Sequence, residues 1–179
     1  MNPNDIIQFW FEEIDSNNWY AKDDAFDALL LQRFGAYHAA AVAGELAEWR
    51  SSAAGRLAEI IILDQFSRNL WRDTARAFAA DSMALALAQD AIAAGADQEL
   101  TGAQKAFLYM PFMHSESAQI HQQALQLFSQ DGMQATLAFE RRHHAIIERF
   151  GRYPHRNAIL GRESSPAELA FLTQPGSSF

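Results

Sequence analysis

Apolar residues recur three and four positions apart along most of the chain, which is the spacing of one face of an α-helix. One such stripe consists of Phe26, Leu30, Phe34, Tyr37 and Ala41. Alanine is abundant and β-branched residues are sparse, so the sequence gives little support for strands. The pattern predicts an all-α fold, a compact array of seven or eight antiparallel helices.

Helix ends are marked by caps and breakers in the sequence. The segments 101–104 and 165–168 have the pattern of capping boxes, and Gly151 is suited to end a helix in the left-handed conformation. Pro111 should kink or end the helix in which it lies. The predicted helices cover residues 4–13, 23–44, 52–70, 79–94, 101–111, 117–129, 133–150 and 165–172.

The predicted helix 52–70 has apolar residues on both of its sides, which indicates a buried, central helix. Asp64 and Arg68 are four positions apart on one side, so they can form a direct ion pair where the helix faces protein. Gln65 and Asn69 add polar groups beside them. Two interpretations stay open: the pair is a buried structural contact, or Asp64 holds Arg68 in place for a ligand.

A second polar group, His114-Ser115-Glu116, lies just past Pro111. A histidine beside a carboxylate at a helix junction can act as an acid–base pair. In the structural alternative, Ser115 or Ser117 caps the next helix and Glu116 lies near the positive end of that helix.

The third group lies in the segment 149–157, where a helix cap and a proline turn are crowded with polar side chains. These side chains are Arg149, Arg152, His155, Arg156 and Asn157. A helix that starts near His155 would offer free N–H groups to an anion, and the arginines would fork onto the same anion. In the alternative interpretation the arginines cap carbonyl groups and pair with acidic residues, among them Glu148 with Arg152, four positions apart.

Composition narrows the possible functions. The 179 residues suit one domain over residues 1–179, in which we expect residues 173–179 to form a frayed tail. The formal charge of −8 argues against nucleic acid as a partner, although residues 141–162 carry six arginines and a single acidic residue. The absence of cysteine removes disulfides, thiolate nucleophiles and cysteine-ligated metal sites.

The sequence gives no support for a metal site, a cofactor site or a membrane location. Neither a metal-ligand spacing nor a glycine-rich nucleotide motif occurs, so we expect no metal and no cofactor. His143 falls on an apolar stripe with Phe139, Ile146 and Phe150, where a hydrogen-bonded core imidazole is expected. The first residues do not resemble a secretion signal, and no apolar run is long enough to span a membrane. We therefore expect a soluble, cytoplasmic protein with no membrane partner. The pattern does not indicate an oligomeric state.

Four ordered motifs resemble those of a largely bacterial family labelled only as a domain of unknown function, nine-two-four. They are Phe9-Trp10-Phe11, the stretch from Leu63 to Asn69, the stretch from Phe107 to Glu116, and the stretch from Arg149 to Arg162. Family members commonly have proline where this chain has Ser67. The resemblance implies a tetratricopeptide-like helical fold and no established activity. The family's motif residues correspond here to Asp64, Gln65, Arg68, Asn69, His114, Ser115, Glu116, Arg152, His155, Arg156 and Asn157.

The polar groups lead to the hypothesis of a binding module whose Arg-rich cleft takes a small anionic ligand or an acidic peptide terminus. Three arginines would bind the anion, Arg68, Arg152 and Arg156. Orientation of the arginines and further hydrogen bonds would come from Asp64, Gln65, Asn69, His114, His155 and Asn157.

The alternative is an enzyme that acts on a phosphorylated or carboxylate metabolite. His114 or His155 would transfer protons, and Glu116 would orient the imidazole. Arg68 would stabilise developing negative charge. A third possibility is a purely structural polar network. An open site favours the first two hypotheses, whereas arginines that are sealed and mutually paired favour the third.

Overall fold

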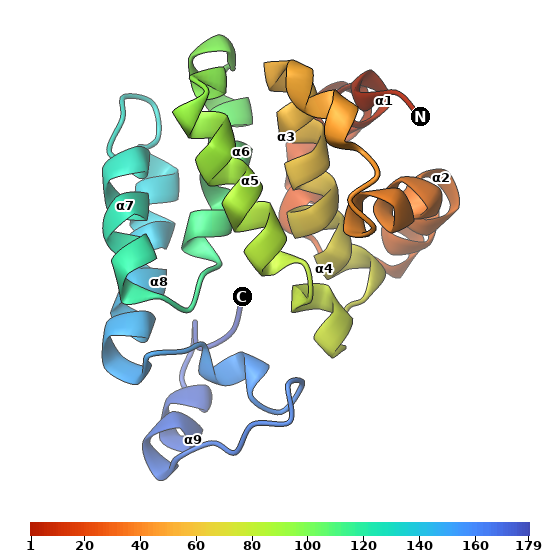
Figure 1. Cartoon of the computed structure of the whole chain (residues 1–179). Coiled ribbons are helices and arrows are strands. Elements are labelled where there is room, and N and C mark those ends of the chain that lie inside the picture. The colour runs from red at the N-terminus through yellow and green to blue at the C-terminus, as the bar shows by residue number, and fades with distance from the viewer. The chain divides into compact units, whose positions relative to one another are not determined.

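The computed structural model describes residues 1–179, and every regular element in it is a helix. The chain forms two compact units (Figure 1). Unit 1 consists of Met1–Arg72 and Arg76–Pro111, and unit 2 consists of Asp73–Ala75 and Phe112–Phe179. The all-α prediction is confirmed. Not one of the helices has an apolar stretch long enough to cross a membrane.

The helix bounds lie close to those that the sequence predicts. Unit 1 contains α1 (Pro3–Gln8), α2 (Asp24–Val42), α3 (Ala53–Ile61), α4 (Ser67–Leu70), α5 (Asp81–Ala93) and most of α6 (Gly102–Met113). Unit 2 contains α7 (Ala118–Phe128), α8 (Gln134–Phe150) and α9 (Pro166–Leu172). Because a π-helical turn at Ile62–Phe66 joins α3 to α4 without a break, these two form one helix, and the chain has eight helices.

Shorter elements complete the chain. A second π-helical turn, Phe9–Glu13, prolongs α1. The 3-10 turns lie at Ser16–Tyr20, Ala47–Ser51, Ala75–Phe78, Ala96–Glu99 and Pro154–Arg156. Apolar periodicity reveals long helices because several turns repeat one face, whereas a single 3-10 turn leaves no such repeat.

The core of unit 1 is built around α3, which lies between α1 and α5 (Figure 1). Leu57, Ile61 and Leu63 are fully buried, so both sides of this helix face protein, as the sequence predicts. Phe66 follows in the π-helical turn and packs against Trp10, with ring centroids 5.5 Å apart. Burial of large aromatic rings supplies much of the hydrophobic stabilisation of this unit.

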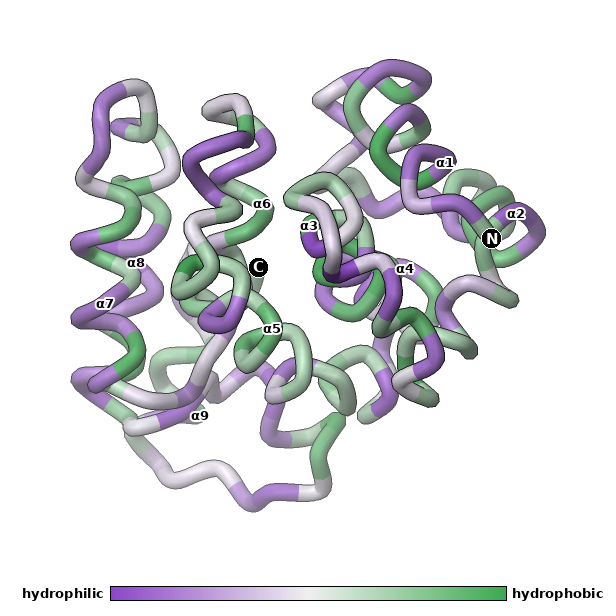
Figure 2. The backbone as a smooth tube through the Cα atoms, turned by 45° about the horizontal axis from the view of Figure 1, so that its top comes forward, coloured by the Kyte–Doolittle hydropathy of each residue, from purple (hydrophilic) through white to green (hydrophobic).

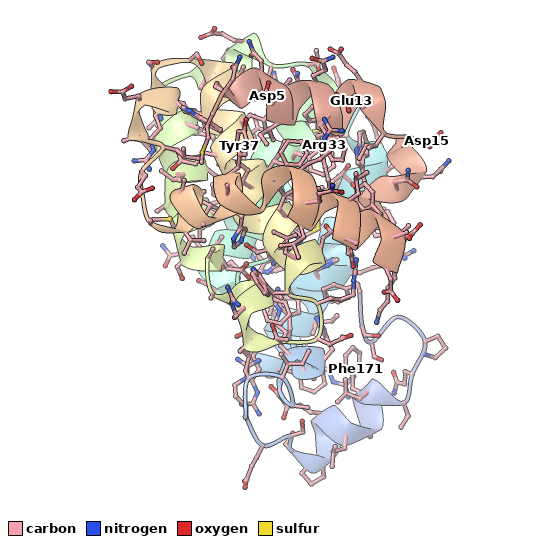
Figure 3. All side chains as sticks on the ribbon, turned by 90° about the vertical axis from the view of Figure 1, so that its right-hand side faces the viewer. Asp5, Glu13, Asp15, Arg33, Tyr37 and Phe171 are labelled. Atoms are coloured by element: carbon pink, nitrogen blue, oxygen red, sulfur yellow. The ribbon has the colours of Figure 1, made fainter.

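Two polar contacts tie α2 to the first helix of unit 1 (Figure 3). The Tyr37 hydroxyl donates to Asp5 Oδ2 at 2.5 Å, and Arg33 Nη1 donates to Glu13 Oε2 at 2.6 Å. The Arg33–Glu13 pair is largely exposed, so we expect it to add little stability.

In unit 2, α7 and α8 lie side by side in both views, and hydrophilic and hydrophobic residues alternate along each (Figures 1 and 2). The buried side of α8 carries Glu140, His143, Ile146 and Ile147. The expectation that Phe139 faces inward is wrong, because its side chain is 55% exposed. The buried stripe passes through the neighbouring Glu140 instead, a residue that an apolar pattern alone does not select.

Local sequence signals set the helix ends. Ser165 and Glu168 form a reciprocal capping box at the start of α9, and Gly151 ends α8 with a φ of 68°. Thr101 and Gln104 make the predicted reciprocal bonds at the start of α6. Pro111 does not end α6, which continues for two residues to Met113, but the boundary between the units falls directly after this proline.

Candidate functional site

Asp64 and Gln65 lie in the π-helical turn between α3 and α4. Such wide turns inside helices are uncommon and occur frequently at functional sites. Both side chains are buried, and Gln65 Nε2 donates to Asp64 Oδ2 at 2.5 Å. The same amide nitrogen lies 3.3 Å from Met110 Sδ. The turn therefore holds a hydrogen-bonded carboxylate inside unit 1.

The predicted ion pair between Asp64 and Arg68 is confirmed. Arg68 Nη1 lies 3.1 Å from Asp64 Oδ1, and it donates to the Asp64 carbonyl at 2.8 Å. The same guanidinium forks onto Asp81, in the first turn of α5, with bonds of 2.9 and 3.0 Å. Two carboxylates thus hold Arg68 in place, and an external anion would have to compete with both.

Asn69 completes the unit 1 group and is buried. Its side-chain amide donates to Asp27 Oδ1 at 2.9 Å, and Arg72 forks onto the same carboxylate at 2.8 and 2.9 Å. These contacts connect α4 to α2. The contacts of Asn69 therefore support the structural interpretation of this residue.

A buried Ser67–His38 contact, which the sequence pattern does not predict, lies beside this group. The Ser67 hydroxyl donates to the Leu63 carbonyl at 2.6 Å and lies 2.9 Å from His38 Nε2. Because the hydroxyl proton is directed at the carbonyl, Ser67 accepts the N–H of His38. Burial, and then the charge of Arg76, lower the pKa of His38. The geometry is that of a tether between two helices, since His38 is not oriented to remove the serine proton.

In unit 2, two predicted groups that are distant in the sequence meet. Glu116 accepts the backbone N–H of Tyr153 at 2.7 Å. Arg156 Nη2 donates to the carbonyl of His114 at 3.1 Å. The fold therefore brings His114 and Glu116 next to the segment 152–157.

Glu116 is held by a second cation. Arg162 forks onto its carboxylate with bonds of 2.6 and 2.9 Å, and Arg162 Nε donates to Asn157 Oδ1 at 3.0 Å. Burial opposes ionisation of Glu116, but the hydrogen bonds from Arg162 and Tyr153 outweigh it and lower the pKa of this carboxyl. Arg162 links Glu116 to Asn157, which is fully buried.

Arg152 and Asn157 both contact Glu168 of α9. Arg152 forks onto its carboxylate at 2.7 and 2.8 Å, and Asn157 Nδ2 donates to Oε1 at 3.3 Å. The fork from Arg152, followed by the Ser165 backbone N–H, lowers the pKa of Glu168 far below its ordinary range. This carboxylate ties the 152–157 segment to α9.

The expected pair between Glu148 and Arg152 is wrong. Helical i,i+4 spacing does not extend past Gly151, because the left-handed glycine ends α8 one residue before Arg152. Glu148 Oε1 instead lies 3.6 Å from His144 Nε2. The partner of Arg152, Glu168, is sixteen positions away, and no local spacing rule predicts it.

His155 and Arg156 lie against the ring of Tyr153. The Arg156 guanidinium is 4.6 Å from the ring centroid, and the His155 ring is 5.7 Å away. Arg156 is buried and His155 is partly exposed. The helix expected near His155 is only the three-residue turn Pro154–Arg156, which is too short to offer a row of free N–H groups.

A fully buried His–Glu pair, absent from the sequence prediction, lies between α7 and α8. His121 Nδ1 is 2.7 Å from Glu140 Oε1, and both side chains are 0% exposed. His121 Nε2 faces the Ser115 carbonyl at 2.8 Å and the Tyr153 hydroxyl at 3.2 Å. Burial raises the pKa of Glu140, and the bond from His121 opposes that shift. Glu140 shares the buried side of α8 with Ile147, and a carboxylate on such a stripe is the signal that could have revealed the pair.

His143 is a buried, hydrogen-bonded imidazole, as predicted. Its Nδ1–H donates to the Phe139 carbonyl at 2.8 Å. Burial lowers the pKa of His143 to about 3, and the nearby imidazoles of His114, His121 and His155 act in the same direction. His143 is therefore neutral at ordinary pH. No group of three or more histidines, aspartates or glutamates is arranged to hold a metal ion.

An open, shallow hollow lies on unit 2, between the end of α8 and the start of α9. Its lining consists of Arg149, Phe150, Arg152, Ser165, Ala167 and Glu168. Arg149 is exposed, and its guanidinium stacks on the rings of Phe150 at 4.7 Å and Phe171 at 5.8 Å. Two guanidinium groups and one carboxylate give this hollow a net positive charge.

A family model of bacterial proteins of unknown function, DUF924, matches residues 6–176. The chain belongs to this family. A solved structure of a protein of unknown function from Agrobacterium tumefaciens is 40% identical in sequence, with a TM-score of 0.91. The match covers 95% of this chain and 96% of that chain. Among curated proteins, none matches the chain.

The DUF924 match extends over both units and includes every residue of the candidate site. In this DUF924 protein the predicted residues form two sets. Asp64, Gln65, Arg68 and Asn69 lie in unit 1, while His114, Glu116, Arg152, His155, Arg156 and Asn157 lie in unit 2. That the two sets share one cleft stays a prediction from the sequence, as does the tetratricopeptide-like arrangement of the helices.

Proposed function

We propose that this DUF924 protein is a helical binding module that recognises the carboxylate or phosphate of a small ligand at the hollow lined by Arg149 and Arg152. The observation that carries the proposal is the presence of two guanidinium groups in one open hollow. An acidic peptide terminus would offer the same chemistry.

The two arginines are suited to this role in different ways. Arg152 is fixed by its fork onto Glu168, so it loses little conformational freedom when an anion arrives. Arg149 is exposed and rests on aromatic rings, and stacking over a ring face leaves the N–H edge of a guanidinium available. Bidentate bonds from arginine to carboxylate or phosphate are among the stronger hydrogen bonds in proteins.

Other predicted residues support this role less well. Arg68 is held by two carboxylates, those of Asp64 and Asp81, and it does not line the hollow. In the enzyme alternative, Glu116 would orient an imidazole, but the Glu116 carboxylate is already bound by Arg162 and by the Tyr153 N–H. Arg68, Glu116 and Arg162 thus favour the structural interpretation, and anion recognition is the preferred function for the hollow.

Thermal unfolding with inorganic phosphate and with citrate tests the proposal, because a ligand that prefers the folded state raises the melting temperature. Sodium chloride at matched ionic strength corrects for general salt effects. We expect a saturable rise for the unmodified protein. Arg149→Gln should weaken binding by about ten- to hundredfold, since a charge-assisted bond contributes roughly 1.5–3 kcal/mol.

Arg142→Gln is the matched control. Arg142 also lies on α8, is exposed and stacks on an aromatic ring, that of Phe139 at 5.6 Å, but it is outside the hollow. This variant should bind phosphate and citrate as the unmodified protein does. The proposal would be contradicted if the melting temperatures of Arg149→Gln and Arg142→Gln rose equally with these anions, or if that of the unmodified protein showed no saturable rise.

A further inference from the structure

The ring of Phe179 lies against three aromatic groups of unit 2. Its centroid is 3.8 Å from that of His143, 4.6 Å from that of His155 and 5.2 Å from that of Tyr153. The Phe179 and Tyr153 rings meet edge to face, with an interplanar angle of 85°. We call His143, Tyr153 and His155 the ring site. All three contact one flat apolar group.

His143 lies on α8, whereas Tyr153 and His155 lie at the 3-10 turn Pro154–Arg156, and hydrogen bonds hold His143 and Tyr153 in place. His143 is fixed on α8 by its bond to the Phe139 carbonyl. The Tyr153 hydroxyl donates to the Met113 carbonyl at 2.5 Å, and its ring is fully buried. Because His143 is neutral, its flat face adds no cation to the site, and a neutral ring fits it best.

Phe179 is held loosely by comparison. Its side chain is 55% exposed, whereas Ser177, two residues earlier, is 5% exposed and donates from Oγ to the Leu172 carbonyl at 3.1 Å. The segment that the sequence predicts to fray is thus anchored at Ser177, and only Ser178 lies between the anchor and the ring. A half-exposed ring on such a short arm can leave the site without unfolding a helix.

We propose that the ring site binds a small planar aromatic molecule and that Phe179 is an exchangeable occupant from the same chain. The ligand places a flat, uncharged ring where the Phe179 ring lies, tilted against His143 and closer to perpendicular to the rings of His155 and Tyr153. Phe179 then competes with the ligand and weakens its apparent affinity. This inference does not depend on the anion-binding hollow, whose lining shares no residue with the ring site.

Indole, a neutral planar probe, tests the proposal by NMR titration of the full chain and of the variant Phe179→Ala. In the unmodified protein, the Phe179 ring current should shift the ring protons of His143 and His155, and the variant should lose these shifts. Indole added to Phe179→Ala should shift the ring protons of His143 and His155 again, to an extent that saturates with indole concentration. We expect Phe179→Ala to bind indole about two- to tenfold more tightly than the unmodified protein, since an aromatic contact is modest in strength.

Phe171→Ala is the matched control, because Phe171 lies near the same end of the chain but packs on Phe150, at 5.1 Å, outside the ring site. Its affinity for indole should equal that of the unmodified protein. The double variant His155→Ala with Phe179→Ala should bind indole more weakly than Phe179→Ala, with far-UV circular dichroism as the check on folding.

Three results would each overturn the proposal. The first is that Phe179→Ala shows no saturable shifts with indole. The second is that the unmodified protein and Phe179→Ala bind indole with equal affinity. The third is that adding His155→Ala to Phe179→Ala leaves indole binding unchanged. The histidine ring shifts of the unmodified protein are a separate readout that needs no variant of His155, so a folding defect in the double variant leaves the test intact.

Discussion

His121 has two ring nitrogens, and each of them faces an acceptor. Nδ1 faces the Glu140 carboxyl, and Nε2 faces the Ser115 carbonyl. The Tyr153 hydroxyl donates its proton to Met113, so it too can only accept from Nε2. Both contacts of the ring are hydrogen bonds only if each contains a proton. This requires either an imidazolium paired with a carboxylate or a neutral imidazole paired with a protonated Glu140. The buried pair therefore carries one proton more than a neutral histidine and a free carboxylate.

Glu140→Gln should change how the stability depends on pH, because it removes the extra proton of the folded pair. Burial raises the pKa of Glu140, so its contribution is present below the unfolded value of 4.5 and is lost as pH rises through the folded pKa. The glutamine amide can donate to His121 without the extra proton. Urea unfolding between pH 5 and 8 should show the unmodified protein losing up to about 1.4 kcal/mol per pH unit relative to the variant.

His121→Ala provides the comparison for this measurement. It leaves a buried carboxylate without its partner, which typically reduces stability by about 3–5 kcal/mol. We expect this loss to exceed that of Glu140→Gln at pH 7. Parallel pH profiles for the unmodified protein and Glu140→Gln would refute the proton count.

At the scale of elements, the start of α3 packs against the 3-10 turn Ala47–Ser51 with no room for a side chain. A Cβ on Gly55 would lie 2.0 Å from the Trp49 carbonyl oxygen and 3.0 Å from Ser52 Oγ, which caps the helix. The same turn contributes Arg50, which forks onto the buried Glu59 of α3 with two bonds of 2.7 Å. The glycine thus allows the approach that the Arg50–Glu59 pair completes.

Gly55→Ala should destabilise the protein by about 1–3 kcal/mol, because the obstructing atom belongs to the backbone and cannot rotate away. Denaturant unfolding measures the change. Gly102→Ala, at the first residue of α6 with open space around its Cβ, is the matched control and should gain about 0.4–1 kcal/mol. Similar changes in stability for Gly55→Ala and Gly102→Ala would show that backbone entropy, rather than the close approach, determines the effect of the substitution at Gly55.

At the scale of the whole molecule, charge is distributed unevenly over the two units. Unit 1 has eight Lys/Arg and fifteen Asp/Glu, a net −7, whereas unit 2 has six and seven, a net −1. The arginine-rich segment 141–162 therefore does not make unit 2 basic. Acidic residues from elsewhere in the unit, such as Glu116 and Glu168, neutralise its arginines.

The two units share helix α6, and we expect them to unfold in one transition. The Tyr109 hydroxyl donates to Asp97 in unit 1 at 2.7 Å, and Met113 at the end of α6 accepts the Tyr153 hydroxyl in unit 2. Loss of either unit would remove one of the hydrogen bonds that anchor this helix. Calorimetry should give one peak with equal calorimetric and van't Hoff enthalpies.

Single substitutions extend this test. Tyr109→Phe removes one of the two hydrogen bonds to Asp97 Oδ2, and Tyr153→Phe leaves the Met113 carbonyl without its donor. Each change costs about 0.5–3 kcal/mol, so each should shift the same single peak to lower temperature. Tyr20→Phe, at a residue that is 72% exposed, should leave it unchanged. Two peaks, of which each variant moves only one, would contradict the prediction of a single cooperative domain.

The sequence by itself determined the helical scaffold, because helix signals are local. Spacing of three and four residues placed the buried faces of α2 and α3, Ser165 and Gly151 marked helix ends, and i,i+4 spacing predicted the Asp64–Arg68 pair. Each of these depends on residues within one or two helical turns of one another. The same rule failed between Glu148 and Arg152, where the helix had ended.

Only the tertiary structure decided the partners of charged groups that are far apart in the sequence. Arg152 pairs with Glu168, Glu116 with Arg162, and His121 with Glu140, across sixteen, forty-six and nineteen positions. The i,i+4 rule applies only within one helix, so sequence spacing cannot select an acidic partner on another part of the chain. The packing of elements brings these groups together, and it thereby determines which carboxylate each arginine engages and which arginines line the open hollow.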